Sequence, residues 1–396
     1  MTRVGRRANV SNVDAEVSDQ IIETLARFVD LDVRPNVARY ESSDTYPGPM
    51  VDQMREFGLF GATIAEEYGG LGLNISTYAR VIEELSRGWM SLAGVINSHL
   101  IAAQLIARFG TDDQRQRLLP AMATGERRGC FSLSEPDSGS DAAALRCRAA
   151  RDGDEWTIDG TKQWVTNGEK ASIVALLART GDDISCFLVE KAPGPDGDQG
   201  ISISRHIDKV GYRGLETVEM AYDGHRLPHH NLLGGDEGFG QGFRWALAAL
   251  ELGRINVAAR AVGVAQAAMD EALSYAQQRE TFGRPIAQHQ GIAFKLADMA
   301  TKLHASRLMV RDAARRVDNG ERADMEAGMA KLFASETAAE LALDAMRIHG
   351  GNGFTTEYPV ERLYRDAPLM IIGEGTSEIQ KLVISRALLA RAKPAE

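Results

Sequence analysis

The stretch INVAARAVGVAQAAMDEALSYA, residues 255–276, decides the fold. Its apolar residues recur every three or four positions, so that Ile255, Val262, Met269 and Leu273 share one face of a long helix. Residues 289–319 and 322–347 also have a helical pattern and predict two further long helices. Long helices with few breaks predict an antiparallel four-helix bundle, which we assign to a C-terminal domain at residues 237–396.

The region before this bundle, residues 126–236, has a different period. Trp156-Thr157-Ile158 and Gln163-Trp164-Val165 flank the turn pair Asp159-Gly160, which predicts a hairpin. Apolar runs at residues 173–178 and 184–189 and alternation at 217–222 predict further strands. We expect a middle β-domain of short strands, arranged as a barrel or a sandwich.

Residues 14–125 are again helical in pattern, with amphipathic stretches at 20–28 and 100–109. A glycine-rich segment, Gly69-Gly70-Leu71-Gly72, interrupts them and is expected to be a simple loop. Helices, then strands, then helices predict an α+β fold with an N-terminal helical domain at 14–125. Residues 1–13 are expected to form a disordered arm.

Composition narrows the class of protein. The chain of 396 residues carries a net charge of −10, and no basic run offsets it, so nucleic-acid binding is not expected. The three cysteines form no CxxC pair and the histidines form no ligand set, so we expect neither a metal site nor disulfides. The sequence has no secretory h-region and no long uninterrupted apolar run, which predicts a cytoplasmic protein outside the membrane.

Two loops of the β-domain carry groups suited to a flavin. The stretch 133–141, LSEPDSGSD, clusters hydroxyls and a glycine that can bind a polar ring edge or a pyrophosphate. The stretch 162–168, KQWVTNG, offers a Trp to cover an aromatic ring and a Thr hydroxyl beside it. A polar turn and a core Trp explain the same residues without a ligand.

Two stretches of the C-terminal domain suit phosphate recognition. Residues 279–285, RETFGRP, place two arginines at a helix break, just before His289-Gln290. Residues 349–354, HGGNGF, allow a close approach of the backbone to a ligand. A solvated loop and a helix stop are the alternatives for these two stretches.

The last stretch, GEGTSEIQ at residues 373–380, holds a carboxylate between glycines where a loop enters the final helix. Glu374 can therefore be uncrowded and act as a proton-abstracting base, with backbone N–H groups free for an oxyanion. A glutamate at a helix start is also a common cap or dipole partner. The stretch alone leaves both roles open.

Taken in order, these stretches resemble the acyl-CoA dehydrogenase family over residues 14–391. The resemblance also covers FGLFG at 57–61, EEYGG at 66–70, FGT at 109–111 and TEYPVER at 356–362. It implies a helical domain, a β-domain and a helical bundle, with FAD between the last two and a homotetramer as the assembly. It also implies electron transfer from the reduced flavin to an electron-transfer flavoprotein.

The resemblance assigns roles to individual positions. Glu374 would be the base, because the family's other base position holds Gly253 here. The substrate contacts would be Ser140, Glu251, Arg254 and Gly375. The FAD contacts, some of them to the FAD of a neighbouring subunit, would be Phe131, Leu133, Ser134, Gly139, Ser140, Trp164, Thr166, Arg279, Thr281, Phe282, Gln290, Arg347, Gly350, Gly351, Thr376 and Glu378.

The implied reaction is α,β-dehydrogenation of an acyl-CoA to the trans-2-enoyl-CoA. Glu374 would take the α-proton while the β-hydride passes to the flavin, and its N–H with a ribityl hydroxyl would bind the thioester carbonyl. Gly373 replaces a bulky aromatic residue, which should enlarge the pocket around the base and makes branched, aromatic or dicarboxylic acyl groups plausible. We expect the substrate to be a short, branched or dicarboxylic acyl group. Residues 88–91, Asn97 and His99 are further candidates for shaping the acyl end, and helix packing is the alternative for Trp89.

Two other functions are compatible with the same residues. The acyl group can instead be carried by a carrier protein, with a dehydrogenase or an oxidase acting on it. A non-catalytic relative that uses the fold for binding is the second alternative, although Glu374, Trp164 and Thr166 argue against it.

Overall fold

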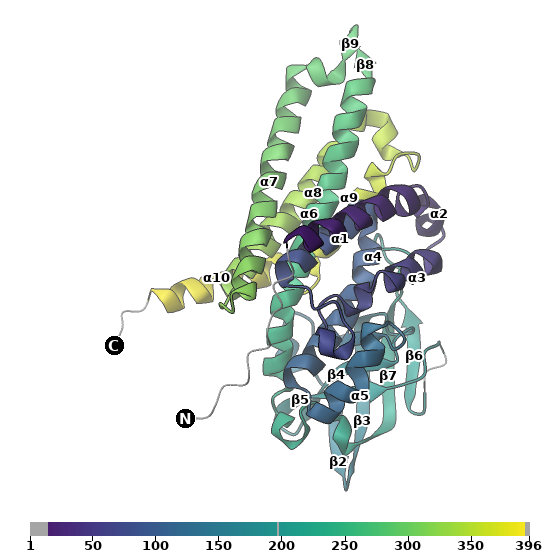
Figure 1. The fold of residues 1–396 in the computed structure, drawn as a ribbon, viewed down its shortest axis with the longest axis vertical. Helices are drawn as coiled ribbons and strands as arrows, with labels where there is room; N and C mark the ends of the chain where they lie inside the picture. The colour runs from purple at the N-terminus through teal and green to yellow at the C-terminus, as the bar shows by residue number, and fades with distance from the viewer. Residues whose placement is uncertain (1–14, 196–197, 393–396) are drawn as a thin grey trace.

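The computed structural model describes residues 15–195 and 198–392. The arm expected at residues 1–13 lies outside this range. The order of elements confirms the α+β prediction, with helices first, a sheet in the middle and helices last (Figure 1).

The N-terminal region is helical. Its helices are α1 (Ala15–Phe28), followed by a π-helical turn at Val29–Val33, then α2 (Val37–Ser42), α3 (Gly48–Glu56), α4 (Ile75–Phe109) and α5 (Asp112–Ala123). The long helix α4 is kinked at Trp89, whose backbone is extended (φ −159°, ψ 115°). By length and composition α4 is the one described helix able to cross a membrane, yet 89% of its apolar window is buried inside the protein.

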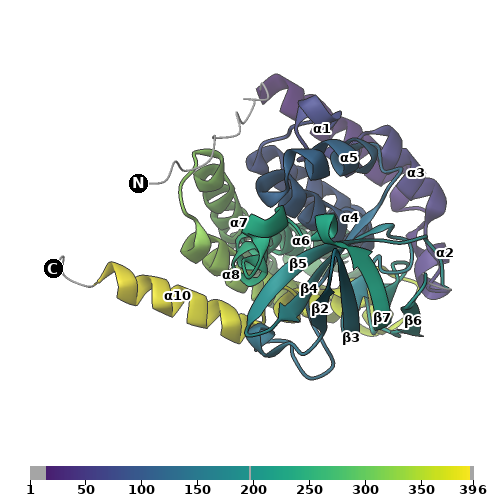
Figure 2. The ribbon, with the colours of Figure 1, turned by 90° about the horizontal axis from the view of Figure 1, so that it is seen from below.

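The middle region is one mixed sheet with strands in the order β1-β4-β2-β3-β7-β6, and β5 paired with β4. The strands are β1 (Gly129–Ser132), β2 (Arg148–Asp152), β3 (Glu155–Thr166), β4 (Ile173–Thr180), β5 (Asp183–Glu190), β6 (Ile201–His206) and β7 (Thr217–Pro228). Alternate residues of β4 enter separate cores: Ile173 and Ala175 join the helical core, and Val174 and Leu176 join a second core within the sheet. The sheet therefore rests on the helices through one face (Figure 2).

The hairpin predicted around Asp159-Gly160 is wrong. Residues 155–166 form the single strand β3, paired with β7, and the pairing register shifts between Ile158 and Gly160. Gly160 has φ 145°, and a Cβ there would lie 2.6 Å from the Cα of Cys147, so this glycine permits an irregularity within a strand rather than a turn. The hairpin that does form joins β2 to β3, with Asp152 paired to Glu155.

The C-terminal region consists of α6 (Gly242–Gln278), α7 (Gln290–Asp318), α8 (Asp324–His349), α9 (Val360–Ile372) and α10 (Ser377–Arg391). The first three run side by side along the long axis of the molecule, and α10 projects away from them (Figures 1 and 2). A small hairpin of β8 (Glu280–Thr281) and β9 (Arg284–Pro285) joins α6 to α7 at the end farthest from the large sheet.

Candidate active site

Glu374 lies in the short connection between α9 and α10, which reverses the chain through two residues with positive φ. These are Glu374 (φ 53°) and Gly375 (φ 92°). A left-handed backbone costs a residue with a side chain about 1–2 kcal/mol, so the surrounding structure must hold this turn in place. The strain is located at the residue that the sequence assigns as the base.

Two buried side chains hold this turn. The ammonium of Lys331, on α8, donates to the carbonyl oxygens of Ile371 (3.0 Å) and Gly375 (2.8 Å). The amide of Gln380 donates to the carbonyl oxygens of Glu374 (3.3 Å) and Gly375 (2.9 Å). Lys331 is fully buried, and this burial lowers its pKa to about 8. Sequence analysis did not single out either residue.

The carboxylate of Glu374 points inward between α4 and α6, and its side chain is only 16% exposed. Its Oε1 accepts a hydrogen bond from Asn97 Nδ2 (2.6 Å) and lies 3.5 Å from Arg260 Nη2. Its Oε2 is buried and has no hydrogen-bond partner in the described part of the chain. One oxygen is therefore anchored, and the other is free to accept a proton.

Gly253 provides the space that this carboxylate occupies. A Cβ built on Gly253 would collide with Oε2 of Glu374. The two positions at which the resemblance allows a base, 253 and 374, therefore meet at one place in the fold. A side chain at 253 would displace the carboxylate at 374.

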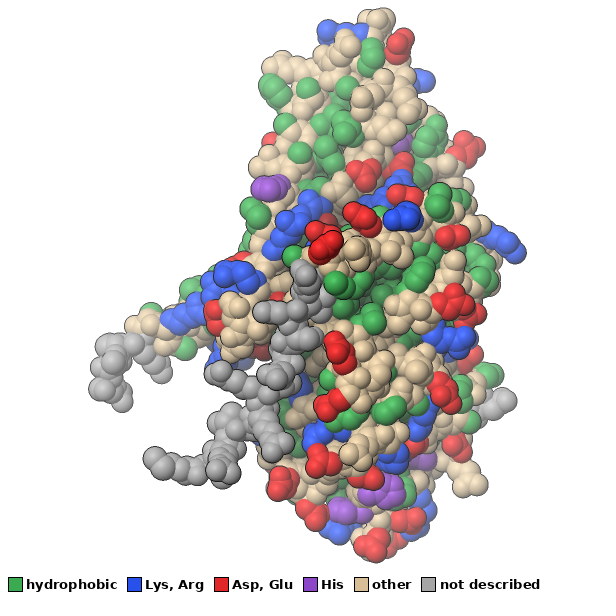
Figure 3. Space-filling model, in the orientation of Figure 1, with side chains coloured by type: hydrophobic (Ala, Val, Ile, Leu, Met, Phe, Trp, Pro, Cys, Tyr) green, Lys and Arg blue, Asp and Glu red, His purple; other side chains and the backbone are tan. Residues whose placement is uncertain are grey.

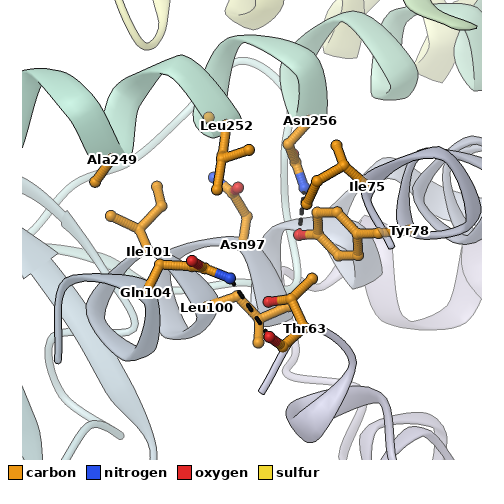
Figure 4. Close-up of a pocket in the computed structure, with 11 residues that line it drawn as sticks. Thr63, Ile75, Tyr78, Asn97, Leu100, Ile101, Gln104, Ala249, Leu252 and Asn256 are labelled. Carbon is orange, nitrogen blue, oxygen red and sulfur yellow. Dashed lines mark hydrogen bonds between the residues drawn. The ribbon is translucent and has the colours of Figure 1, made fainter. Parts of the chain in front are cut away.

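A narrow cavity of about 20 Å³ adjoins Gly253 and Asn97. Its lining comes from α4 and α6, with Thr63 completing one side (Figure 4). The apolar side chains of Leu100, Ile101, Ala249 and Leu252 form one part of the lining, and Gln104 lies beside Ile101 (Figure 4). On the other side, Tyr78 and Asn256 form a polar part, with Asn97 next to it. Gly373 does not line this cavity, so the enlargement expected from that glycine is not observed in it.

A buried arginine lies beside the polar part of the lining. Arg260 is 4% exposed; its Nε donates to Asn256 Oδ1 (2.9 Å) and its Nη1 donates to the Tyr212 hydroxyl (3.2 Å). Asn256 in turn donates to the Tyr78 hydroxyl (2.8 Å). Sequence analysis missed this group. The signal was present, because Arg260 and Asn256 are polar residues within a run of small apolar ones and share a helix face with Gly253.

The expected flavin-ring residues of the sheet are brought together. The backbone N–H of Gln163 donates to Ser134 O (2.9 Å), and Lys162 Nζ donates to Leu133 O (2.9 Å), which joins the two loops. Trp164 has φ 63° and is 56% exposed, so it is not a core tryptophan. Its indole is available to cover a ring beside the half-buried Phe131, Leu133 and Thr166.

A buried ion pair fixes the loop that carries Gly139 and Ser140. Lys162 Nζ lies 2.7 Å from Glu135 Oε1, and both side chains are nearly inaccessible. Burial alone would raise the pKa of Glu135, but the hydrogen bond and charge of Lys162 and the N–H groups of Arg146 and Cys147 lower it below its usual value. Gly139 and Ser140 remain exposed on this loop.

The other expected FAD contacts lie at the opposite end of the molecule, around the β8–β9 hairpin (Figure 1). His289 lies between the Thr281 hydroxyl (3.1 Å) and Arg284 (3.2 Å), and Phe282 is 96% exposed. Arg347 pairs with Asp344 (3.3 Å). Exposed residues of this set, besides Phe282, are Arg279, Gln290, Arg347, Gly350 and Gly351. Within one chain, these residues around the β8–β9 hairpin therefore lie far from the expected flavin-ring residues of the sheet.

The remaining candidates occupy helix positions near the cavity or the final helix. Thr376 caps α10 by accepting from the Ile379 N–H (3.4 Å), and Glu378 is exposed in the first turn. Glu251 Oε1 accepts from the Ala323 N–H (3.0 Å), and burial raises the Glu251 pKa. Arg254 is 8% exposed, and its Nε has no partner among residues 15–195 and 198–392.

Two residues proposed to shape the acyl end serve the framework instead. His99 Nδ1 accepts from the Gly129 N–H (2.9 Å), and its Nε2 bonds to Phe60 O (3.0 Å). Burial lowers the His99 pKa to about 4. Trp89 is buried at the kink of α4 against Gly214, which is a packing role. Of the candidates for this end, Asn97 alone lines the cavity.

Comparison with known proteins covers nearly the whole chain. Sequence models of the N-terminal, middle and C-terminal domains of acyl-CoA dehydrogenase match residues 15–126, 130–224 and 240–389. An acyl-CoA dehydrogenase of Bacillus subtilis is 41% identical, over 91% of this chain and 95% of that one. The (2S)-methylsuccinyl-CoA dehydrogenase of Cereibacter sphaeroides is 41% identical, over 96% of this chain and 70% of that protein.

Solved structures agree with this result. Butyryl-CoA dehydrogenase from Megasphaera elsdenii superposes with a TM-score of 0.90 at 32% identity, covering 98% of this chain and 100% of that one. A glutaryl-CoA dehydrogenase from Mycobacterium smegmatis in complex with FADH2 gives 0.89 at 30% identity, covering 97% of each chain. A chain from work on the electron transferring flavoprotein of Acidaminococcus fermentans gives 0.90 at 36% identity, covering 96% and 99%.

Fold and comparisons together define an FAD-dependent oxidoreductase. Within that class, the chain belongs to the acyl-CoA dehydrogenase family. The predicted family, fold class and cofactor are thereby confirmed.

Proposed function

We propose that this enzyme removes the α- and β-hydrogens of an acyl-CoA thioester, giving the trans-2-enoyl-CoA, with Glu374 as the base. The observation that supports this most directly is the carboxylate geometry. Asn97 binds Oε1, while Oε2 is buried and unpartnered in the described residues, and it lies against Gly253, which lines the cavity. A general base needs such a free oxygen within reach of the proton that it accepts.

The residues around Glu374 support defined tasks in this reaction. Asn97 fixes the carboxylate so that Oε2 accepts the α-proton. The N–H of Glu374 would donate to the thioester carbonyl and stabilise the developing enolate. Lys331 and Gln380 hold the turn that presents both groups. The apolar walls of the cavity exclude water from the reacting carbons.

The residues present fit FAD. An exposed indole at Trp164 and the half-buried Phe131, Leu133 and Thr166 offer a surface for the flavin ring. Exposed arginines and glycines at the β8–β9 end suit the phosphates of a second flavin. Bound FAD supplies the hydride acceptor for the β-hydrogen.

Assembly and electron transfer follow from the same proposal. Because the two sets of FAD contacts lie at opposite ends of one chain, each cofactor would be bound by two subunits of a homotetramer. Exposed apolar side chains are frequent over the upper helical part in Figure 3, and Phe282, Phe294 and Phe354 are among the exposed ones. An electron-transfer flavoprotein would accept the electrons, and the enzyme would be cytoplasmic.

The substrate would be a short, branched or dicarboxylic acyl-CoA. Glu251, Arg254, Ser140 and Gly375 are proposed to contact it, and the small cavity favours a short acyl group. The alternative is an acyl group carried by a carrier protein, with oxygen as acceptor. Consumption of oxygen without an added acceptor would favour that alternative.

The proposal is tested by anaerobic bleaching of the flavin in Glu374→Gln. The amide cannot accept the proton, so we expect retained fold and FAD but flavin reduction slower by about 10²-fold or more. Glu357→Gln, which changes an exposed glutamate in the loop before α9, is the matched control and should reduce normally. A near-normal rate of flavin reduction in Glu374→Gln would show that Glu374 is not the base.

A further inference from the structure

The role of Glu374 as the base does not explain why part of the cavity lining is polar. An apolar acyl chain needs apolar walls, yet Tyr78, Asn97 and Asn256 line this cavity and Arg260 lies behind them. We call these four residues and Tyr212 the polar end; Tyr78, Asn97 and Asn256 line the cavity, and Arg260 and Tyr212 lie behind Asn256. Burial raises the pKa values of both tyrosines, so each remains a neutral hydroxyl at ordinary pH.

The cation of this polar end is poorly compensated. Arg260 is 4% exposed, and within the described residues its only ion-pair partner is Glu374, at 3.5 Å. A guanidinium has five N–H donors, and the hydrogen bonds of Arg260 use one on Nε and one on Nη1. A buried cation is costly unless an anion and hydrogen bonds compensate it. Arg260 therefore has capacity for a second anionic partner.

Other features of the fold keep Arg260 in this place. Gly253, Asn256 and Arg260 lie on one face of α6, so the arginine continues the line of residues that forms the cavity wall. The Tyr212 hydroxyl, which accepts from Nη1, occupies space that a side chain at Gly94 would fill. The guanidinium is thus held from both sides, with Nη2 directed toward the carboxylate of the base.

We infer that Arg260 binds a carboxylate at the far end of the acyl group, so that the substrate is the monothioester of a short dicarboxylic acid. This inference rests on the proposed function, because it places the substrate α-carbon at Glu374. Each C–C bond is about 1.5 Å long, so a carboxylate one or two bonds beyond the β-carbon reaches the neighbourhood of the base. There it would meet Arg260, Asn256 and the Tyr78 hydroxyl.

The first test compares acyl groups with and without this carboxylate. The FAD-loaded enzyme is assayed with methylsuccinyl-CoA and glutaryl-CoA against butyryl-CoA and isobutyryl-CoA. We expect kcat/KM to be higher for at least one dicarboxylic thioester by about 10-fold or more, the effect of one hydrogen-bonded charge pair. A preference for both monocarboxylic thioesters would overturn the inference and leave the dehydrogenase function intact. Failure of all four, even at high concentration, would count against the proposed function as well.

The second test removes the cation. Arg260→Gln removes the contact with Glu374 for every substrate, but only a dicarboxylic thioester also loses the partner of its own carboxylate. We therefore expect kcat/KM to fall by about 10²-fold for the preferred dicarboxylic thioester and by much less for butyryl-CoA. Arg260→Lys should retain part of the preference. Arg307→Gln is the matched control and should leave the preference unchanged, because Arg307 is a half-buried arginine on α7 whose partner is Glu83 on α4. An equal loss for both classes would make Arg260 a positioning residue for Glu374 and contradict the inference.

A binding measurement separates recognition from turnover. Glu374→Gln holoenzyme, which cannot take the α-proton, is titrated with methylsuccinyl-CoA and butyryl-CoA by calorimetry. Adding Arg260→Gln should weaken binding of methylsuccinyl-CoA by about 10-fold or more and leave butyryl-CoA within a few-fold. Equal affinities of the two variants for methylsuccinyl-CoA would contradict a carboxylate site at Arg260.

Discussion

The proposed acyl side and the proposed cofactor side of this enzyme are built in opposite ways. Around Glu374 the chemistry-bearing groups are buried, and each is bound by others of the same chain, as Asn97, Arg260 and Lys331 show. On the proposed cofactor side, Trp164 and the residues of the β8–β9 hairpin such as Phe282 are exposed, and these two groups lie at opposite ends of the chain. From this difference we infer that one chain completes the proposed substrate site, whereas the proposed cofactor site needs a neighbouring subunit.

The largest effect that tests this contrast is expected at Gly253. Gly253→Val should lower kcat by about 10²-fold while FAD stays bound, because its side chain would displace the Glu374 carboxylate and small misplacements are costly in catalysis. Stopped-flow flavin reduction and the flavin spectrum measure the two properties. Gly48→Ala is the control, since a Cβ at that glycine, at the start of α3, meets nothing within 4 Å. Normal turnover in Gly253→Val would show that the carboxylate beside Gly253 is not the base.

A smaller effect, on stability, is expected at His99, which joins α4, the helix that carries Asn97, to β1 of the sheet. Its pKa in the folded protein is about 4, below the usual 6.5, so the unfolded chain binds the proton more tightly. The stability that this neutral histidine provides is present above pH 6.5 and is lost as the pH falls toward 4. We expect about 2 kcal/mol of that loss between pH 7 and pH 5.

Denaturant unfolding of His99→Gln against the wild-type enzyme measures this difference. The variant has no titrating group at this position, so its stability should fall less over the same pH interval, although it is less stable at pH 7. Parallel pH curves for the two proteins would show that His99 does not carry the dependence.

The smallest effect, on FAD affinity, is expected at the exposed end of the molecule around the β8–β9 hairpin. Arg279→Gln should weaken FAD binding by about 10-fold, as for one charge-assisted hydrogen bond, and leave the surroundings of Glu374 unchanged. Equilibrium dialysis of FAD measures the affinity, and kcat at saturating FAD reports on the acyl side. Lys381→Gln, on α10, serves as a charge control. If the FAD affinity of Arg279→Gln is unchanged, the cofactor is not shared in the way that we propose.

Much of the fold could be predicted because local patterns in the sequence specify its helices and strands. The long helices follow the recurrence of apolar residues, and the runs at 173–178 and 184–189 are the strands β4 and β5. The hairpin at Asp159-Gly160 failed because a glycine suits a strand irregularity as well as a turn, and only the neighbouring Cys147 decides between them. Local sequence does not contain that neighbour.

The candidate site was also predictable only where local sequence specifies it. The motif flanking Glu374 marked the residue, but its partners Asn97 and Arg260 come from α4 and α6, far away along the chain. Arg260 lies among residues such as Ile255 and Val262, whose regular spacing drew attention to the apolar face of the helix. Which groups meet across helices depends on packing, and no pattern within one helix specifies it.

The left-handed backbone at Glu374 has a consequence for how this enzyme can change. Glycine would relieve the backbone at residue 374, but loss of the carboxylate would leave the buried Arg260 without its ion-pair partner in the described residues. The position is therefore not free to drift toward glycine, even where selection on activity is relaxed. A lower melting temperature in Glu374→Gly would show that the carboxylate stabilises this turn as well as serving the reaction, and a higher one would show that the backbone strain outweighs the ion pair.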